Sequence, residues 1–182
     1  MANRANFLHD PEPDLEARAI FAEDVESWGF VMNLSLLWSH QPRALEGLLA
    51  LARQVATDGG LTPRQRYLIV LAGSAARESS YCVLAWQRKL PGLLEPPTVA
   101  GVVAGDPGAP GLDDAECALV GWVRRVVQSP ATTGPGDVEA LRVAGYSERE
   151  IFAITVFAAL RMAFSTVNDA LGAEPDEELR EG

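Results

Sequence analysis

Histidine, cysteine and positive charge are scarce in this sequence, and each scarcity excludes a class of function. There are only two histidines, His9 and His40, and two cysteines, Cys82 and Cys117. Cysteines this far apart fit none of the spacings typical of zinc sites, so we expect no metal centre and at most one disulfide. The sequence also lacks a Gly-rich phosphate-binding loop and a Gly-x-Ser-x-Gly turn, and we expect no cofactor.

The charge balance argues against polyanionic partners. The 182 residues carry 15 Lys and Arg against 25 Asp and Glu, a formal net charge of −10. Such a surface repels phosphate backbones and anionic lipids, so we expect neither nucleic acid nor membrane as a partner. Arg161 and Asn168 interrupt the longest apolar stretch, and the first residues lack the apolar core of a secretory signal. We therefore predict a soluble, cytoplasmic protein.

The composition and the segments at the two ends predict a single helical domain. Hydrophobic residues make up 48% and charged residues 22%, which is average for a globular protein. A Pro-containing lead occupies residues 1–13, the folded domain residues 14–172, and an acidic tail, expected to be disordered, residues 173–182. No segment alternates apolar and polar residues as a strand does. We predict an all-α fold of roughly seven or eight helices.

Capping signals mark where the helices begin. Asp14 is suited to cap a first helix that Gly29 ends, and capping boxes start at Thr62, Asp113 and Ser147. Further helices are expected over 42–57, 80–90, 98–103 and 137–145. The helix that follows Thr62 is apolar on every face and should lie at the centre, while residues 93–111 should form a mobile connection around one short helix. Helices this apolar in so short a chain also predict a homo-oligomer.

Cys82 is the most informative candidate for chemistry. If Ser79 caps the helix, Cys82 is its third residue, close to the unpaired amide groups of the first turn. That position favours the thiolate, provided that the sulfur is partly exposed. Otherwise Cys82 is a small apolar packing residue, as most free cysteines are.

The segments Leu61-Thr62-Pro63-Arg64-Gln65-Arg66 and Ser79-Ser80-Tyr81-Cys82-Val83-Leu84-Ala85 resemble the AhpD-like alkylhydroperoxidase and carboxymuconolactone decarboxylase superfamily. The resemblance covers most of positions 30–175 and is strongest to the peroxidase-related branch. It implies an all-helical, AhpD-like homo-oligomer. The family's redox motif is a glutamate, eleven residues and then Cys-x-x-Cys-x-x-x-His, and its peroxide-reacting second cysteine aligns with Cys82.

The other three motif positions differ from the family. Ser79 replaces the first cysteine, Tyr67 the glutamate and Trp86 the histidine. Ser79 cannot form the resolving disulfide, and neither tyrosine nor tryptophan is a base near neutral pH. The replacements indicate a pocket richer in aromatic surface and poorer in charge, which suits a small organic ligand. The alternative is that Tyr67 and Trp86 simply fill the space as core.

Three functional hypotheses follow. The first is a redox-cofactor-independent lyase or isomerase for a small apolar metabolite, with Tyr67 as proton donor, Cys82 or His40 as acceptor, and Trp86 and Ser79 as substrate-binding residues. The second is a single-thiol peroxidase with Cys82 as nucleophile. The third is a non-catalytic binding or assembly subunit.

Overall fold

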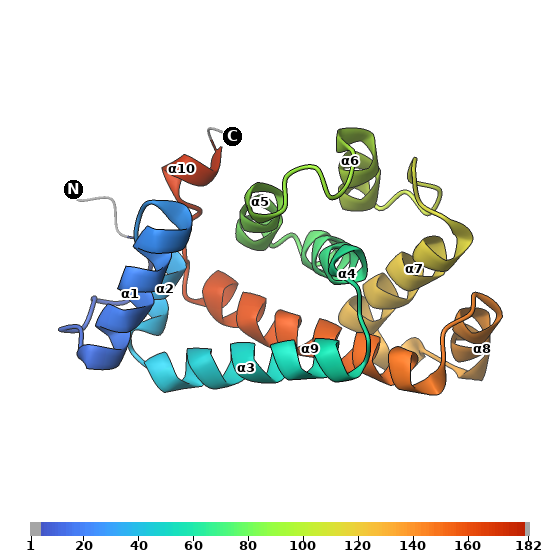
Figure 1. Cartoon of the computed structure of the whole chain (residues 1–182), viewed down its shortest axis with the longest axis horizontal. Helices are drawn as coiled ribbons and strands as arrows, with labels where there is room; N and C mark the ends of the chain where they lie inside the picture. The colour runs from blue at the N-terminus through green and yellow to red at the C-terminus, as the bar shows by residue number, and fades with distance from the viewer. Residues whose placement is uncertain (1–4, 181–182) are drawn as a thin grey trace.

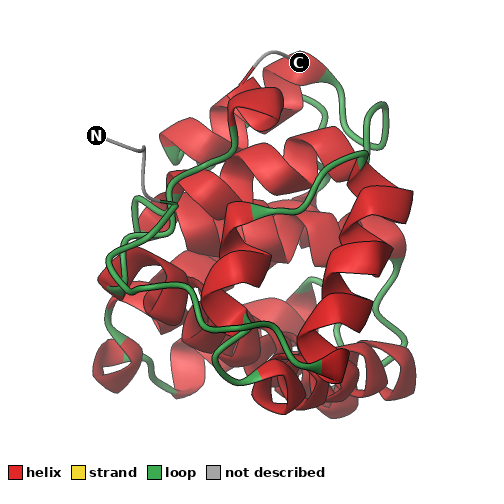
Figure 2. Ribbon diagram, turned by 90° about the vertical axis from the view of Figure 1, so that its left-hand side faces the viewer, coloured by secondary structure: helices red, strands yellow, loops and turns green. Residues whose placement is uncertain are grey.

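The computed structural model describes residues 5–180, and this part of the chain is helical throughout, with no strand. The all-α prediction is confirmed (Figures 1 and 2). The predicted number of helices is too low, because the described residues form ten α-helices, some of them very short. They are α1 Leu15–Trp28, α2 Asn33–Trp38, α3 Pro42–Asp58, α4 Pro63–Ala76, α5 Ser80–Lys89, α6 Pro96–Ala104, α7 Asp114–Gln128, α8 Pro135–Val143, α9 Glu148–Ala170 and α10 Glu177–Arg180, with a 3-10 turn at Pro130–Thr132.

The helix starts that the sequence predicts are present. Asp14 accepts a hydrogen bond from the amide of Ala17 at 2.8 Å. Thr62, Asp113 and Ser147 each form a reciprocal capping box with the Gln or Glu three residues on. Each such cap satisfies amide groups that the helix itself leaves unpaired, and contributes about 1 kcal/mol.

Helix α4 lies at the centre, as its apolar sequence predicts. Every residue from 67 to 74 is buried, and the helix packs against α5, α6, α7 and α9 (Figure 1). The end of α3 packs closely on α9 at Gly59, where an added Cβ would lie 2.2 Å from the Cβ of Ala153. Glycine is therefore required at this crossing, and α9 is held between α3 and α4.

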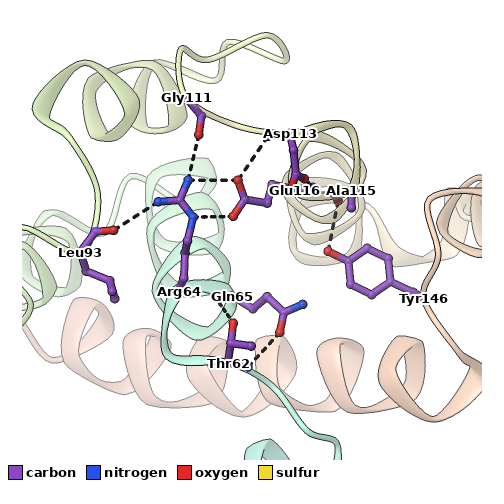
Figure 3. Close-up of polar contacts among 9 residues, drawn as sticks. All are labelled: Thr62, Arg64, Gln65, Leu93, Gly111, Asp113, Ala115, Glu116 and Tyr146. Carbon is purple, nitrogen blue, oxygen red and sulfur yellow. Dashed lines mark hydrogen bonds and ion pairs between the residues drawn. The ribbon is translucent and has the colours of Figure 1, made fainter.

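The connection between α5 and α7 is anchored by Arg64. Its guanidinium donates to the carbonyl oxygens of Leu93 and Gly111 and pairs with the carboxylate of Glu116 at 2.5 Å (Figure 3). One side chain of α4 thus binds both ends of a segment whose Pro- and Gly-rich composition predicts mobility. This anchor lies at the first turn of α4, whereas α5 follows the other end of that helix.

The acidic tail, which the sequence predicts to be disordered, packs against the domain as far as residue 180. The buried carboxylate of Asp176 accepts hydrogen bonds from the hydroxyl of Tyr81 and from the amide of Asn33, the latter at 2.8 Å. Leu179 of α10 is 4% exposed and packs with residues of α5. The tail therefore covers α5, because its apolar and acidic residues find partners that its composition does not reveal.

Helix α9 is long and apolar enough to span a membrane by length and composition alone, but it is a core helix here. Nine of its residues are buried, and it packs against α3, α4 and α7. Its described contacts are those of a helix packed inside a helical domain.

Candidate functional site

Cys82 lies in the first turn of α5 and is almost enclosed. Its side chain is 2% exposed, and its sulfur is 3.1 Å from the hydroxyl oxygen of Ser165 on α9. Ser79 occupies the N-cap position, but its hydroxyl does not cap the helix; it donates to the carboxylate of Asp169 at 3.0 Å. Ser79 is itself buried and engaged in this bond, so its predicted role in substrate binding finds no support in its contacts.

Arg161 of α9 is the charged neighbour of Cys82. It is 8% exposed, and its guanidinium lies over two aromatic rings, 5.4 Å from the centre of Trp86 and 4.8 Å from that of Phe164. Desolvation lowers the pKa of this arginine, and its interaction with Cys82 opposes that effect. A buried positive charge beside a thiol is a natural counter-ion for the thiolate.

Tyr67 and Trp86, which replace the family's glutamate and histidine, are in contact. Their rings stack with centres 6.2 Å apart and planes 26° from parallel. Tyr67 is 2% exposed, and desolvation raises the pKa of its phenol, so the hydroxyl remains protonated and can donate. Through Trp86 and Arg161, this pair is continuous with Cys82. Helices α4, α5 and α9 therefore bring three of the five predicted site residues near one another, with Tyr67 and Trp86 in the hydrophobic cluster around α4 and Cys82 in the neighbouring one.

His40 does not join that cluster. It is exposed between α2 and α3, and its backbone amide donates to the carbonyl of Leu37 at 3.4 Å. Its predicted role as a proton acceptor for a ligand at Cys82 finds no support in this position. The second thiol, Cys117, lies on α7 and, like Cys82, is free.

Two hollows of the described surface lie away from the enclosed pocket that the sequence predicts between Tyr67, Cys82 and Trp86. One hollow of about 630 Å³ is lined by residues such as Phe30, Asn33 and Asp176, and another of about 520 Å³ lies beside Arg124 on α7. Neither includes a residue of the predicted pocket. A ligand that reaches Cys82 therefore has to displace side chains or the α10 segment that packs with them.

Sequence reasoning missed Arg161 and Ser165 as site residues, although a signal was present. Both interrupt the apolar sequence of α9, and their separation of four residues places them on one face of a helix. When a charged residue and a hydroxyl residue share the buried face of an apolar helix, they indicate a polar partner on the facing helix. Here that partner is Cys82.

Comparison with known proteins supports the family resemblance through structure. No protein-family model matches the chain, and no curated protein matches it. Among solved structures, an uncharacterized peroxidase-related protein with an alkylhydroperoxidase AhpD core from Ralstonia eutropha JMP134 is 25% identical, with a TM-score of 0.84 over 98% of this chain and 96% of the other.

Two further structures show how widely the fold is shared. An uncharacterized peroxidase-related protein from Silicibacter sp. TM1040 is 22% identical, with a TM-score of 0.78 over 97% of this chain and 95% of the other. The debrominase Bmp8, as a Cys-to-Ala variant in complex with 2,3,4-tribromopyrrole, is 16% identical, with a TM-score of 0.76 over 100% of this chain and 96% of the other. The protein therefore has the AhpD-like fold, and its resemblance to the AhpD-like superfamily and the peroxidase-related branch is confirmed.

Proposed function

We propose that the chain is a diverged AhpD-like enzyme with Cys82 as its one catalytic thiol, and that its reaction is the reduction of small organic hydroperoxides. The observation that carries this proposal is the environment of the sulfur. A hydroxyl group, that of Ser165, lies 3.1 Å from it, and the guanidinium of Arg161, which makes no ion pair with an acidic residue of the described part of the chain, is its charged neighbour. A thiolate is the nucleophile in peroxide reduction, and a fixed positive charge favours the thiolate.

The reaction requires one thiol in the protein and two from outside. The thiolate of Cys82 attacks an oxygen of the hydroperoxide, so that an S–O bond forms, the O–O bond breaks, and the alkoxide takes a proton and leaves as an alcohol. An external thiol then condenses with the sulfenic acid and releases water. A second external thiol restores Cys82 and leaves as the oxidised disulfide.

Arg161 and Ser165 take over part of what the family's glutamate and histidine supply. Both are donors beside the sulfur, and donors in that position stabilise the negative charge that develops on the leaving oxygen. Neither can accept a proton as a carboxylate or an imidazole does. We therefore expect a single-thiol enzyme that is slower than one with the complete motif.

A cofactor-independent lyase or isomerase acting on a small apolar metabolite is the second candidate. It is favoured by the phenol of Tyr67, which is buried and stacks against the ring of Trp86. The debrominase Bmp8 binds a small aromatic molecule, which supports a similar capacity in this fold. In this mechanism Tyr67 donates a proton and Cys82 accepts one or forms a covalent intermediate.

The oxidation of Cys82 by cumene hydroperoxide tests the first candidate. We expect intact-mass spectrometry to find one added oxygen on Cys82, formed at least about tenfold faster than on free cysteine at the same pH. Cys82→Ser should abolish the reaction, and Cys117→Ser, the matched control, should leave it unchanged. A rate no greater than that of free cysteine would rule out the peroxidase and leave the lyase or isomerase and the non-catalytic subunit. A role in cells that survives Cys82→Ser would favour the latter.

We propose that the active form is a homo-oligomer. Several apolar side chains are exposed in the single chain, among them Val143 at 80% and Phe152 at 72%. Apolar surfaces of this kind are commonly covered by a second subunit. Sedimentation that finds only monomer at cellular concentration would contradict this assembly.

A further inference from the structure

Arg161 has a buried charge that no acidic residue neutralises. Ion pairs within residues 5–180 involve Arg43, Arg64, Arg125, Arg142 and Arg180, all of them with exposed or half-buried side chains, and none involves Arg161. The Nε atom of Arg161 is buried with no hydrogen-bond partner. Buried charges in proteins are normally paired and fully hydrogen-bonded, so this arrangement is incomplete as it stands.

The neighbours of the guanidinium do not supply enough hydrogen-bond acceptors for its N–H groups. Trp86 and Phe164 present ring faces, which attract a cation but accept no N–H bond in the plane of the guanidinium. Cys82 offers one sulfur, whereas a guanidinium has five N–H donors arranged in a fork. A group with two acceptor oxygens in one plane would satisfy the remaining donors.

Lys89 adds a second positive charge near Arg161. The pKa of Lys89, at the end of α5, is lowered. Desolvation is the largest cause, and the positive charges of Arg161 and of Arg53 on α3 act in the same direction. The ammonium of Lys89 lies 5.9 Å from the ring centre of Trp28. The carboxylate of Glu23 acts on the pKa of Lys89 in the opposite direction. An anion bound at Arg161 would meet this second positive charge as well.

We infer that Arg161 is the receptor for the carboxylate of a small aromatic or unsaturated monocarboxylate, which binds beside Cys82. The inference deepens the proposed function and rests on it for the role of Cys82, because it assigns the charge and shape of the molecule on which that thiol acts. A carboxylate matches the planar fork of the guanidinium with two parallel hydrogen bonds. The rings of Trp86, Phe164 and Tyr67 supply apolar faces for the rest of the ligand.

Calorimetric titration of the full-length protein with benzoate and with benzamide tests this inference. The two molecules have the same ring and nearly the same size, and differ in the charge of the group that would meet Arg161. We expect benzoate to bind at least about tenfold more tightly than benzamide at low salt. Arg161→Gln should remove this preference, while Arg149→Gln, an exposed arginine on the same helix, should retain it.

Several outcomes would overturn the carboxylate site. These are no binding of either molecule to the wild type, equal affinities for the two, or an Arg161→Gln variant that still prefers benzoate. If circular dichroism shows that Arg161→Gln does not fold, Arg161→Lys replaces it, and should weaken benzoate binding because an ammonium lacks the planar fork. The wild-type comparison of the two ligands stands without any variant.

The same variants separate this inference from the proposed function. Cys82→Ser should bind benzoate with an affinity within about threefold of the wild type, because the thiol is not the receptor. Benzoate binding with no fast oxidation of Cys82 would support the carboxylate site and refute the peroxidase. Fast oxidation of Cys82 with no preference for benzoate would support the peroxidase and refute the carboxylate site.

Discussion

The two hydrophobic clusters of this protein are built on opposite principles. One is centred on α4, α7 and α9 and is almost purely apolar, with Leu68, Val70, Leu119 and Ile154 fully buried. The other surrounds Cys82 and is interleaved with buried polar groups, among them Arg161, Ser165, Asn168, Asp24 and Asp176. The first needs only close packing to be stable. Buried donors without a partner occur in both, at Arg66 and Ser74 on α4 and at Arg161 and Asn168 near Cys82, but of the two arginines only Arg161 is a buried residue, and a cost of this kind is expected where a site is kept for function.

Leu68→Ala should produce the largest change in stability, because it removes buried side-chain atoms from the apolar cluster. Leu68 is 0% exposed at the centre of α4. Removal of its buried methyl groups leaves a cavity, and we expect the free energy of unfolding to fall by about 2–5 kcal/mol. Urea denaturation measures this loss. A loss below 1 kcal/mol would mean that the cluster around α4 is loosely packed, and would remove the contrast with the cluster around Cys82.

Arg161→Met should have the opposite pattern, with reactivity lost and stability kept. Replacement of a buried unpaired charge by an apolar side chain of similar length is commonly neutral or stabilising, and we expect stability to stay constant or to rise by about 1 kcal/mol. The rate at which cumene hydroperoxide oxidises Cys82 should fall by about 10–100-fold, because a charge-assisted donor is lost. Destabilisation with an unchanged rate would show that Arg161 has a purely structural role.

The pH dependence of stability should also distinguish the two clusters, because buried carboxyl groups lie in the cluster around Cys82. This effect should be smaller than those of the two substitutions above. Desolvation raises the pKa of Asp24 and Asp176 above the ordinary value of 3.8, so the folded protein binds protons more tightly at these carboxyls than the unfolded chain does. Their contribution to stability is therefore largest at acidic pH and is lost as the pH rises through the raised values.

Asp176→Asn removes one of these titrations. Relative to the wild type, its free energy of unfolding should increase as the pH rises from 4 to 7, and urea denaturation at a series of pH values measures the difference. Asp106→Asn, on an exposed loop, provides the matched control and should follow the wild type. Parallel curves for the wild type and Asp176→Asn would contradict the raised pKa of Asp176.

The sequence was sufficient for the fold because the information there is local. Thr62, Asp113 and Ser147 cap helices through residues three positions away, and the all-round apolar character of 67–72 is enough to place that helix at the centre. Tyr67 and Trp86, which align with two positions of the family's motif, lie in contact, but their predicted roles stay predictions.

The candidate site was only half predictable, because its remaining members meet across long separations. Arg161 and Ser165 reach Cys82 from a helix about eighty positions further along the chain, and Asp176 meets Tyr81 across 95. No periodicity within one segment reveals which buried face opposes which. The prediction of His40 as a proton acceptor rested on residue type alone. The structure places His40 between two helices at the surface.

The bond between Tyr81 and Asp176 makes the last turn of the chain part of the site's architecture. A premature stop codon at position 174 would remove little mass and no helix longer than one turn, and by length alone would be judged harmless. It would nevertheless leave the phenol of Tyr81 without its carboxylate acceptor and strip Leu179 from the apolar surface next to Cys82. Loss of this cover would bring the sulfur of Cys82, the thiol of the proposed reaction, closer to solvent and to oxidants of any kind.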